Sequence, residues 1–191
     1  MAKPRILAFA GSARKESYNR KLIQIAVRGA RSAGADVTLL ELKDYPLPIM
    51  DEDLEKEGTP ENALKLKKIF VEHDGLLMSC PEYNSSITPL LKNTIDWVSR
   101  PAPSEPALVG FTGKAATLMS ASPGGLGGLR GLVHVRSILG NIGVVVLPEQ
   151  IAVSRAFEAF NADGSLKDAK TQAGVEKLGV TLATFLAKVR G

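Results

Sequence analysis

Residues 11–19, with the sequence GSARKESYN, join an apolar run at residues 4–10 to an amphipathic segment at residues 17–33. A strand that turns into a helix in this way presents unpaired backbone N–H groups and the positive end of the helix macrodipole to an anion. Ser12, Ser17 and Asn19 can add hydrogen bonds, and Arg14 adds charge. The sequence therefore predicts that a phosphate group binds at this first strand–helix turn.

The same loop lacks the glycines that other phosphate-binding loops require. A dinucleotide fingerprint has three spaced glycines at this turn, whereas only Gly11 is present here. This difference favours a monophosphate. The Gly-Lys pair at residues 113–114 lacks the first glycine of the nucleotide-triphosphate loop, so nucleotide triphosphate chemistry is not expected.

Length and composition predict one globular domain over residues 1–191, because 45% of the residues are hydrophobic and can form a substantial core. The net charge of +4 is spread among acidic residues and aromatics make up only 5%, so we expect no nucleic-acid partner. No apolar stretch reaches the roughly 18 residues of a membrane helix, which predicts no membrane partner and a cytoplasmic location. With one cysteine and two histidines, neither an internal disulfide nor a bound metal is expected.

Five apolar runs alternate with helical patterns along the chain. Such alternation predicts an α/β fold, with a doubly wound, five-stranded parallel sheet of order 2-1-3-4-5 between two layers of helices. The expected strands are residues 4–10, 36–42, 75–80, 114–121 and 143–147. Residues 45–60 and 100–113 hold many of the prolines and are expected to be surface loops.

In this strand order a ligand lies beyond the carboxyl ends of the strands, so three loops should form the site. The first loop is residues 11–19, the second is residues 81–89, and the third is residues 120–128. Two prolines restrict the second loop, and we expect its amides to face a flat heterocycle rather than another strand, with Tyr83 beside the ring. The third loop offers hydroxyls and glycine amides to the same ligand.

Two motifs in this order, G-S-x-R-x-x-S-x-N and P-E-Y-N-x-S leading into L-K-N-x-I-D-W, resemble the NAD(P)H-dependent FMN reductase family, which has the flavodoxin-like fold and includes quinone and chromate reductases. The resemblance implies bound FMN, with its phosphate at the first loop, its ring and ribityl chain at the second, and the third loop closing the site. The residues expected to bind the cofactor are Gly11, Ser12, Arg14, Ser17, Tyr18, Asn19, Pro81, Glu82, Tyr83, Asn84, Ser85, Ser120, Ser122, Gly124 and Gly125.

The resemblance also implies an activity. Electrons from NADPH or NADH would pass through FMN to a small-molecule acceptor by ping-pong kinetics, the acceptors being quinones, chromate, azo compounds, ferric complexes or free flavin. The flavin performs the chemical step, so no catalytic residue is nominated. The resemblance further implies a homodimer or a homotetramer.

Two other functions compete with this interpretation. A non-catalytic flavodoxin-type electron carrier would share the fold, but such carriers resemble acidic proteins with a threonine-rich phosphate loop. A phosphatase of similar topology would need a cysteine in the first loop, which has none. Individual residues also have purely structural interpretations: Ser17 as a helix cap, Asn19 as a first-turn polar residue, Trp97 and Cys80 as packing residues, and His134 as a helix-face residue.

Overall fold

The computed structural model describes residues 3–102 and 105–189. Five parallel strands form a sheet in the order β2-β1-β3-β6-β7. Their bounds are β1 Arg5–Ala10, β2 Asp36–Leu40, β3 Gly75–Ser79, β6 Ala115–Ala121 and β7 Val145–Val153. Counted as successive strands of the sheet, this is the order 2-1-3-4-5, so the prediction of a doubly wound parallel sheet is confirmed.

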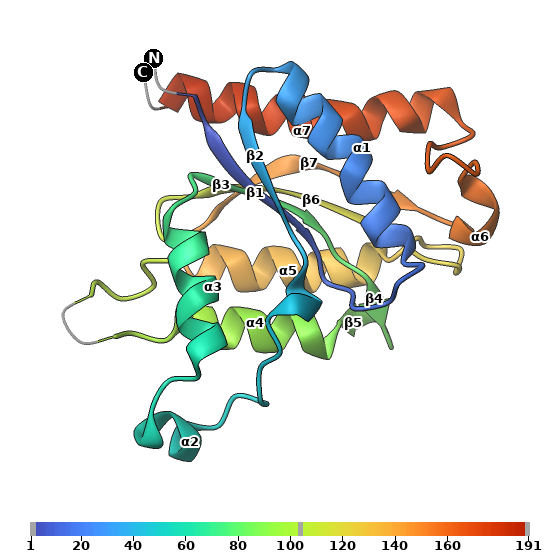
Figure 1. The fold of residues 1–191 in the computed structure, drawn as a ribbon. Coiled ribbons are helices and arrows are strands. Elements are labelled where there is room, and N and C mark those ends of the chain that lie inside the picture. Colours follow the sequence, from blue (N-terminus) through green and yellow to red (C-terminus); the bar gives the residue numbers. More distant parts are fainter. Residues whose placement is uncertain (1–2, 103–104, 190–191) are drawn as a thin grey trace.

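Helices cover both faces of the sheet, as Figure 1 shows: α1 (Tyr18–Ser32) and α7 (Ala169–Val189) lie on one side, and α3 (Glu61–Val71), α4 (Pro89–Ser99) and α5 (Leu129–Asn141) on the other. Each layer has its own apolar core against the sheet. The central strands β1, β3 and β6 are buried almost throughout, which explains their continuous apolar runs.

Helices α1 and α7 pack unusually closely, because each contributes a glycine at the contact. A Cβ atom at Gly29 would lie 2.0 Å from the carbonyl oxygen of Glu176, and one at Gly179 would lie 2.0 Å from that of Ala26. Any side chain at either position would push the two backbones apart. The C-terminal half of α1 is therefore held closely against α7.

The structure differs from the sequence prediction at the outer strand β7, which continues to residue 153 rather than ending at residue 147. A register shift opposite Ala116–Leu118 accommodates the interrupting Pro148 and Glu149. This strand lies at the edge of the sheet, where a proline without an N–H donor is tolerated.

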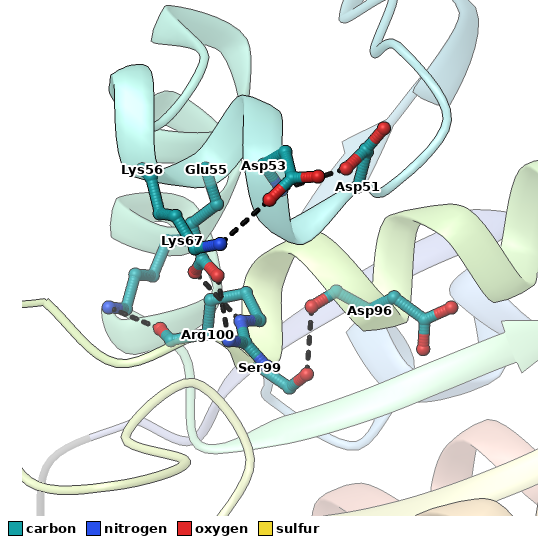
Figure 2. A network of polar contacts seen from close by, with 8 residues as sticks. All are labelled: Asp51, Asp53, Glu55, Lys56, Lys67, Asp96, Ser99 and Arg100. Atoms are coloured by element: carbon teal, nitrogen blue, oxygen red, sulfur yellow. Dashed lines mark hydrogen bonds and ion pairs between the residues drawn. The ribbon is translucent and has the colours of Figure 1, made fainter.

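The expected surface loop at residues 45–60 contains a short helix, α2 (Glu52–Glu57), that polar contacts fix to the rest of the molecule. Figure 2 shows the Arg100 guanidinium donating two hydrogen bonds of 2.7 Å to the carboxylate of Glu55. The Arg100 carbonyl accepts a further bond of 2.9 Å from the ammonium group of Lys67 on α3. These bonds attach α2 to the C-terminal end of α4 and, through Arg100, to the middle of α3.

Candidate functional site

The three loops of the candidate site begin side by side at the carboxyl edge of the sheet, where the hairpin and α6 (Ala156–Ala159) also lie (Figure 1). The Gly11 N–H donates to the Ser79 carbonyl at 2.9 Å, and the Cys80 N–H donates to the Met119 carbonyl at 2.8 Å. The Ser122 N–H donates to the Val153 carbonyl at 3.1 Å. The sheet ladder thus extends into all three loops, which confirms that they share one edge.

A single buried side chain, Asn19, ties the first loop to the other two strand ends. Its amide nitrogen donates to the Ala121 carbonyl at 2.7 Å, and its amide oxygen accepts from the Ala121 N–H at 3.0 Å. The same oxygen accepts from the Ser79 hydroxyl at 2.9 Å. Since both ends of the amide are engaged, Asn19 holds the loops in place through these contacts.

The first loop has the features of an anion site. Ser12 and Ser17 are buried, and Ser17 occupies the N-cap position of α1 without a capping hydrogen bond from its side chain to the described helix. The Ser17 side chain therefore does not act as an ordinary helix cap. The first turn of α1 holds no acidic residue that could neutralise the amino end.

These features fit the phosphate of FMN. The amino end of α1 and the Ser17 hydroxyl can donate to a phosphate oxygen, while exposed Arg14 supplies positive charge beside them. Ser12 Oγ accepts from the Arg14 N–H at 3.3 Å, which leaves the Ser12 O–H able to donate. Gly11 is fixed by packing: a Cβ there would lie 3.1 Å from Leu91 Cβ.

Tyr18 is the first residue of α1 and contacts the segment that follows α6. Its half-buried ring stacks on Phe160, with ring centroids 5.9 Å apart and an interplanar angle of 13°. This contact joins the start of α1 to the segment that follows α6. Tyr18 was expected to bind the cofactor, and the structure places its ring in a packing contact.

The second loop forms a β-hairpin, which the sequence analysis did not expect. Strands β4 (Glu82–Tyr83) and β5 (Ser86–Ile87) pair with each other, so part of the loop backbone faces another strand after all. Asn84 and Ser85 form the tip, with φ angles of 49° and 67°. Positive φ at both central residues is typical of a type I′ turn, which fits the twist of a hairpin. Asparagine tolerates this backbone conformation, whereas it strains Ser85.

The side chains of the second loop that were expected to contact the cofactor point in different directions in the hairpin. Tyr83 is 52% exposed, so its ring is available to a ligand. The carboxylate of Glu82 instead turns toward α5 and accepts from the Gly131 N–H at 2.9 Å. Pro81 is buried, and its Cδ would contact a Cβ at Gly11, which places it against the first loop.

Thr88 connects the hairpin and α4 to the first loop. Its hydroxyl donates to the Gly11 carbonyl at 2.7 Å and accepts from the Leu91 N–H at 3.2 Å, so it caps α4. Pro89 occupies the first turn of α4, where its missing N–H has no cost. Thr88 was not predicted as a site residue, although a threonine before a helix-initiating proline signals a cap.

In the third loop, the glycines with positive φ are not Gly124 and Gly125, which the sequence analysis expects to bind the cofactor. Ser122 accepts from the Gly124 N–H at 3.3 Å, and a Cβ would find open space at Gly125. The glycines that the backbone needs are Gly127 and Gly128, with φ of 63° and 93°. A Cβ at Gly128 would lie 2.0 Å from Ser120 Oγ, which is buried without a hydrogen-bond partner among the described residues. Ser120 is one of the predicted site residues, and its side chain lies against Gly128.

Three other residues follow their structural interpretations. Cys80 is fully buried, and burial raises the pKa of its thiol, so it is no nucleophile at neutral pH. Trp97 is buried and donates from its indole nitrogen to the Pro48 carbonyl at 2.8 Å. His134 lies exposed on α5 and shares a 2.8 Å hydrogen bond with the Ser86 hydroxyl, beside a pocket of about 510 Å³.

Comparison with known proteins identifies the chain's family. A family model described as NADPH-dependent FMN reductase matches residues 4–158. The chain belongs to this family. It is 34% identical to an NAD(P)H-dependent FMN reductase of Pseudomonas aeruginosa, over 98% of this chain and 97% of that protein. It is also 34% identical to an NAD(P)H:quinone oxidoreductase of Solanum tuberosum, over 98% and 95% of the two chains.

Solved structures agree with the assignment of fold and family. The flavoenzyme NAD(P)H:(acceptor) oxidoreductase FerB of Paracoccus denitrificans superimposes with a TM-score of 0.81 at 31% identity, covering 98% of both chains. An azoreductase of Bacillus anthracis matches at a TM-score of 0.60 and 17% identity, which supports the flavodoxin-like fold alone. The chain is therefore an oxidoreductase of the flavin- and NAD(P)H-dependent class, and the competing interpretation as a non-catalytic carrier is not supported.

Two further properties hold for residues 3–102 and 105–189, the part of the chain that the structure describes. None of the helices there is both long and apolar enough to cross a membrane. In the same residues, no group of three or more His, Cys, Asp or Glu side chains is placed to hold a metal ion.

Proposed function

We propose that this protein binds one FMN at the carboxyl edge of its sheet and reduces small-molecule acceptors, quinones first among them, with NADPH or NADH. The observation that carries the proposal is the amino end of α1, with buried Ser12 and Ser17, a Ser17 hydroxyl not used as a cap, and Arg14 alongside. Membership of the FMN reductase family supports the choice of FMN as the phosphorylated ligand.

Each loop has its own part in holding the cofactor. Ser12, Ser17 and the first-turn amides of α1 donate to the phosphate, and Arg14 offsets its charge. Tyr83, Asn84 and Ser85 at the hairpin tip border the ring, and Ser122, Gly124 and Gly125 close the site from the third loop. Asn19, Thr88 and Pro81 hold the loops in position through the contacts described above.

The chemistry requires little further from the protein. FMN, when bound, accepts a hydride from the nicotinamide and passes electrons to the acceptor. The exposed ring of Tyr83 offers a flat apolar surface beside which planar substrates can rest. Reductant and acceptor use this surface in turn, so the kinetics are ping-pong. Chromate, azo compounds, ferric complexes and free flavin are further acceptors that an open site of this kind admits.

Two measurements test the activity. In an anaerobic titration of the FMN-loaded protein, stoichiometric NADPH or NADH should bleach the flavin absorbance promptly; no bleaching without a partner reductase would instead identify an electron carrier. In steady-state assays with a quinone, double-reciprocal plots at several NADPH concentrations should be parallel. Intersecting lines would contradict a shared site.

A pair of serine variants tests the phosphate position. Ser17→Ala should weaken FMN binding about 10- to 100-fold, because one hydrogen bond to a charged group contributes about 1.5–3 kcal/mol. Ser32 lies at the other end of the same helix and donates to the Gly29 carbonyl at 2.8 Å, so Ser32→Ala is the matched control. Equal FMN affinity of the two variants would place the phosphate elsewhere.

The assembly and location belong to the same proposal. We expect a homodimer or a homotetramer acting in the cytoplasm, since members of this family commonly complete the flavin site with a neighbouring subunit. Light scattering at micromolar concentration should give at least twice the mass of the 191-residue chain. A monomer with full activity would contradict this part.

A further inference from the structure

We infer that Glu82 is a positioning residue: its carboxylate caps α5 from the hairpin, fixes the strand that carries Tyr83, and offsets the positive charge at the start of α5. Glu82 belongs to the sequence motif expected to lie against the flavin ring, yet its carboxylate points into the protein toward α5. The part of this role that concerns the flavin rests on the proposed function.

Helix α5 begins without a cap of its own. Its N-cap is Gly128, which has no side chain to accept a hydrogen bond, and its first turn contains no acidic residue. Glu82 Oε2 accepts from the N–H of Gly131, the third residue of the helix, at 2.9 Å. A carboxylate from 49 residues earlier in the chain therefore takes the place of a local cap.

The hairpin sits directly on this first turn. A Cβ atom at Gly131 would lie 3.3 Å from the Ser86 carbonyl oxygen and 3.4 Å from Glu82 Cβ, so a side chain there would have to push the two segments slightly apart. The Glu82 side chain is 11% exposed, and its second oxygen lies 3.6 Å from Arg130 Nε. A largely buried carboxylate thus has both a hydrogen-bond donor and a counter-charge.

The hairpin needs such an attachment because its own structure is weak. Only two residue pairs join β4 to β5, and two-stranded hairpins are marginally stable alone. The positive φ angle of Ser85 adds strain at the tip. Glu82 fastens β4 to α5 through Gly131, and Ser86 fastens β5 to the same helix through His134. The position of Tyr83 follows from these two bonds.

Glu82 also sets the charge beside the hairpin. The amino end of α5 carries a partial positive charge, and Arg130 adds a full one. With Glu82 ionised, these charges are largely offset. Without it, the uncompensated positive charge favours whichever form of a bound flavin is more negative, which is the reduced form.

The experiment compares Glu82→Ala, Glu82→Gln and the control Glu72→Gln. Glu72 is an exposed residue at the end of α3, at the opposite edge of the sheet, so its variant removes the same charge without touching the hairpin. Hydrogen exchange is measured first, without FMN. Glu82→Ala should speed exchange of the amides of residues 82–87 and of Gly131 at least tenfold. Glu82→Gln keeps an acceptor oxygen and should restore most of the protection.

The reduction potential is measured next, on the FMN-loaded proteins. Glu82→Gln should tighten binding of reduced relative to oxidised FMN about three- to tenfold, an upward shift of about 15–30 mV for a two-electron couple. Glu72→Gln should leave the potential unchanged.

The exchange measurement and the potential measurement each test one of the two roles proposed for Glu82. Unchanged exchange in Glu82→Ala overturns the attachment, and an unchanged potential in Glu82→Gln overturns the charge offset. If the wild-type protein binds no FMN, the proposed function fails, whereas the exchange data still decide the attachment.

Discussion

Replacing Asn19 with alanine removes the side chain that joins the first loop to the ends of β3 and β6. Three buried hydrogen bonds disappear: two with the backbone of Ala121 and one from the Ser79 hydroxyl. Ala121 and Ser79 are both buried, so water has poor access to the groups left behind. We therefore expect a large loss of stability from one polar side chain.

The size of the loss follows from the number of groups left unpaired. Leaving one buried polar group without a partner costs about 1–3 kcal/mol. Three groups lose their partners, namely the N–H and the carbonyl of Ala121 and the Ser79 hydroxyl. Partial entry of water offsets some of the cost, which gives about 3 kcal/mol. For a domain of this size, one kcal/mol corresponds to about 2–4 °C, so Tm should fall by about 6–12 °C.

Thermal and urea unfolding of the protein without FMN measure this loss. Asn19→Asp is nearly isosteric, but it places a second acceptor oxygen against the Ala121 carbonyl, so it should be at least as destabilising as Asn19→Ala. Asn62 is the control: its amide makes a 3.0 Å bond to the Pro46 carbonyl at the protein surface, and Asn62→Ala should cost less than about 1 kcal/mol. If Asn19→Ala lowers Tm by no more than Asn62→Ala does, the three bonds do not join the loops.

Three further predictions concern groups outside the flavin contacts. Burial raises the pKa of the Cys80 thiol, so a thiol reagent should label the native protein at least about 100-fold more slowly than the urea-unfolded chain; equal rates would contradict its burial. Hydrogen bonds from Arg100 lower the pKa of Glu55, so this pair stabilises the fold above the ordinary Glu value of 4.5 and loses its effect as pH falls through the lowered value. Arg100→Gln should thus destabilise by at most about 1 kcal/mol at neutral pH, and the difference from wild type should shrink in acid unfolding experiments; a constant difference would refute the pairing. Thr88→Ala should cost about 2 kcal/mol in urea unfolding by removing the cap of α4 and the bond to Gly11, whereas Thr88→Ser keeps the hydroxyl and should cost less than half as much.

The sheet could be predicted from the sequence because its strands are buried on both faces. A parallel strand buried on both faces is apolar throughout, so a run such as residues 75–80 can be recognised as a strand from its sequence. Short connections between elements then limit the possible strand orders. The edge strand β7 was predicted too short because Pro148 and Glu149 interrupt its apolar pattern. An edge position tolerates such residues, but sequence alone does not mark which strand lies at the edge.

The loops of the site could be located, but the directions of their side chains could not. The order of the strands brings residues 11–19, 81–89 and 120–128 to one edge whatever their detailed conformation. Whether Asn19 faces a ligand or Ala121, and whether Glu82 faces a ring or Gly131, depends on contacts across 102 and 49 residues of chain. The hairpin was missed for a related reason, since its turn uses Asn-Ser instead of the usual Asn-Gly signal.

The central claim, that the first loop binds the phosphate of FMN, is tested most directly by comparing two flavins that differ only in that group. Isothermal titration of the flavin-free protein should give an FMN affinity at least about 100-fold higher than that for riboflavin, because two or more hydrogen bonds to a charged phosphate contribute about 3 kcal/mol or more. Equal affinities for FMN and riboflavin would contradict the assignment of the first loop.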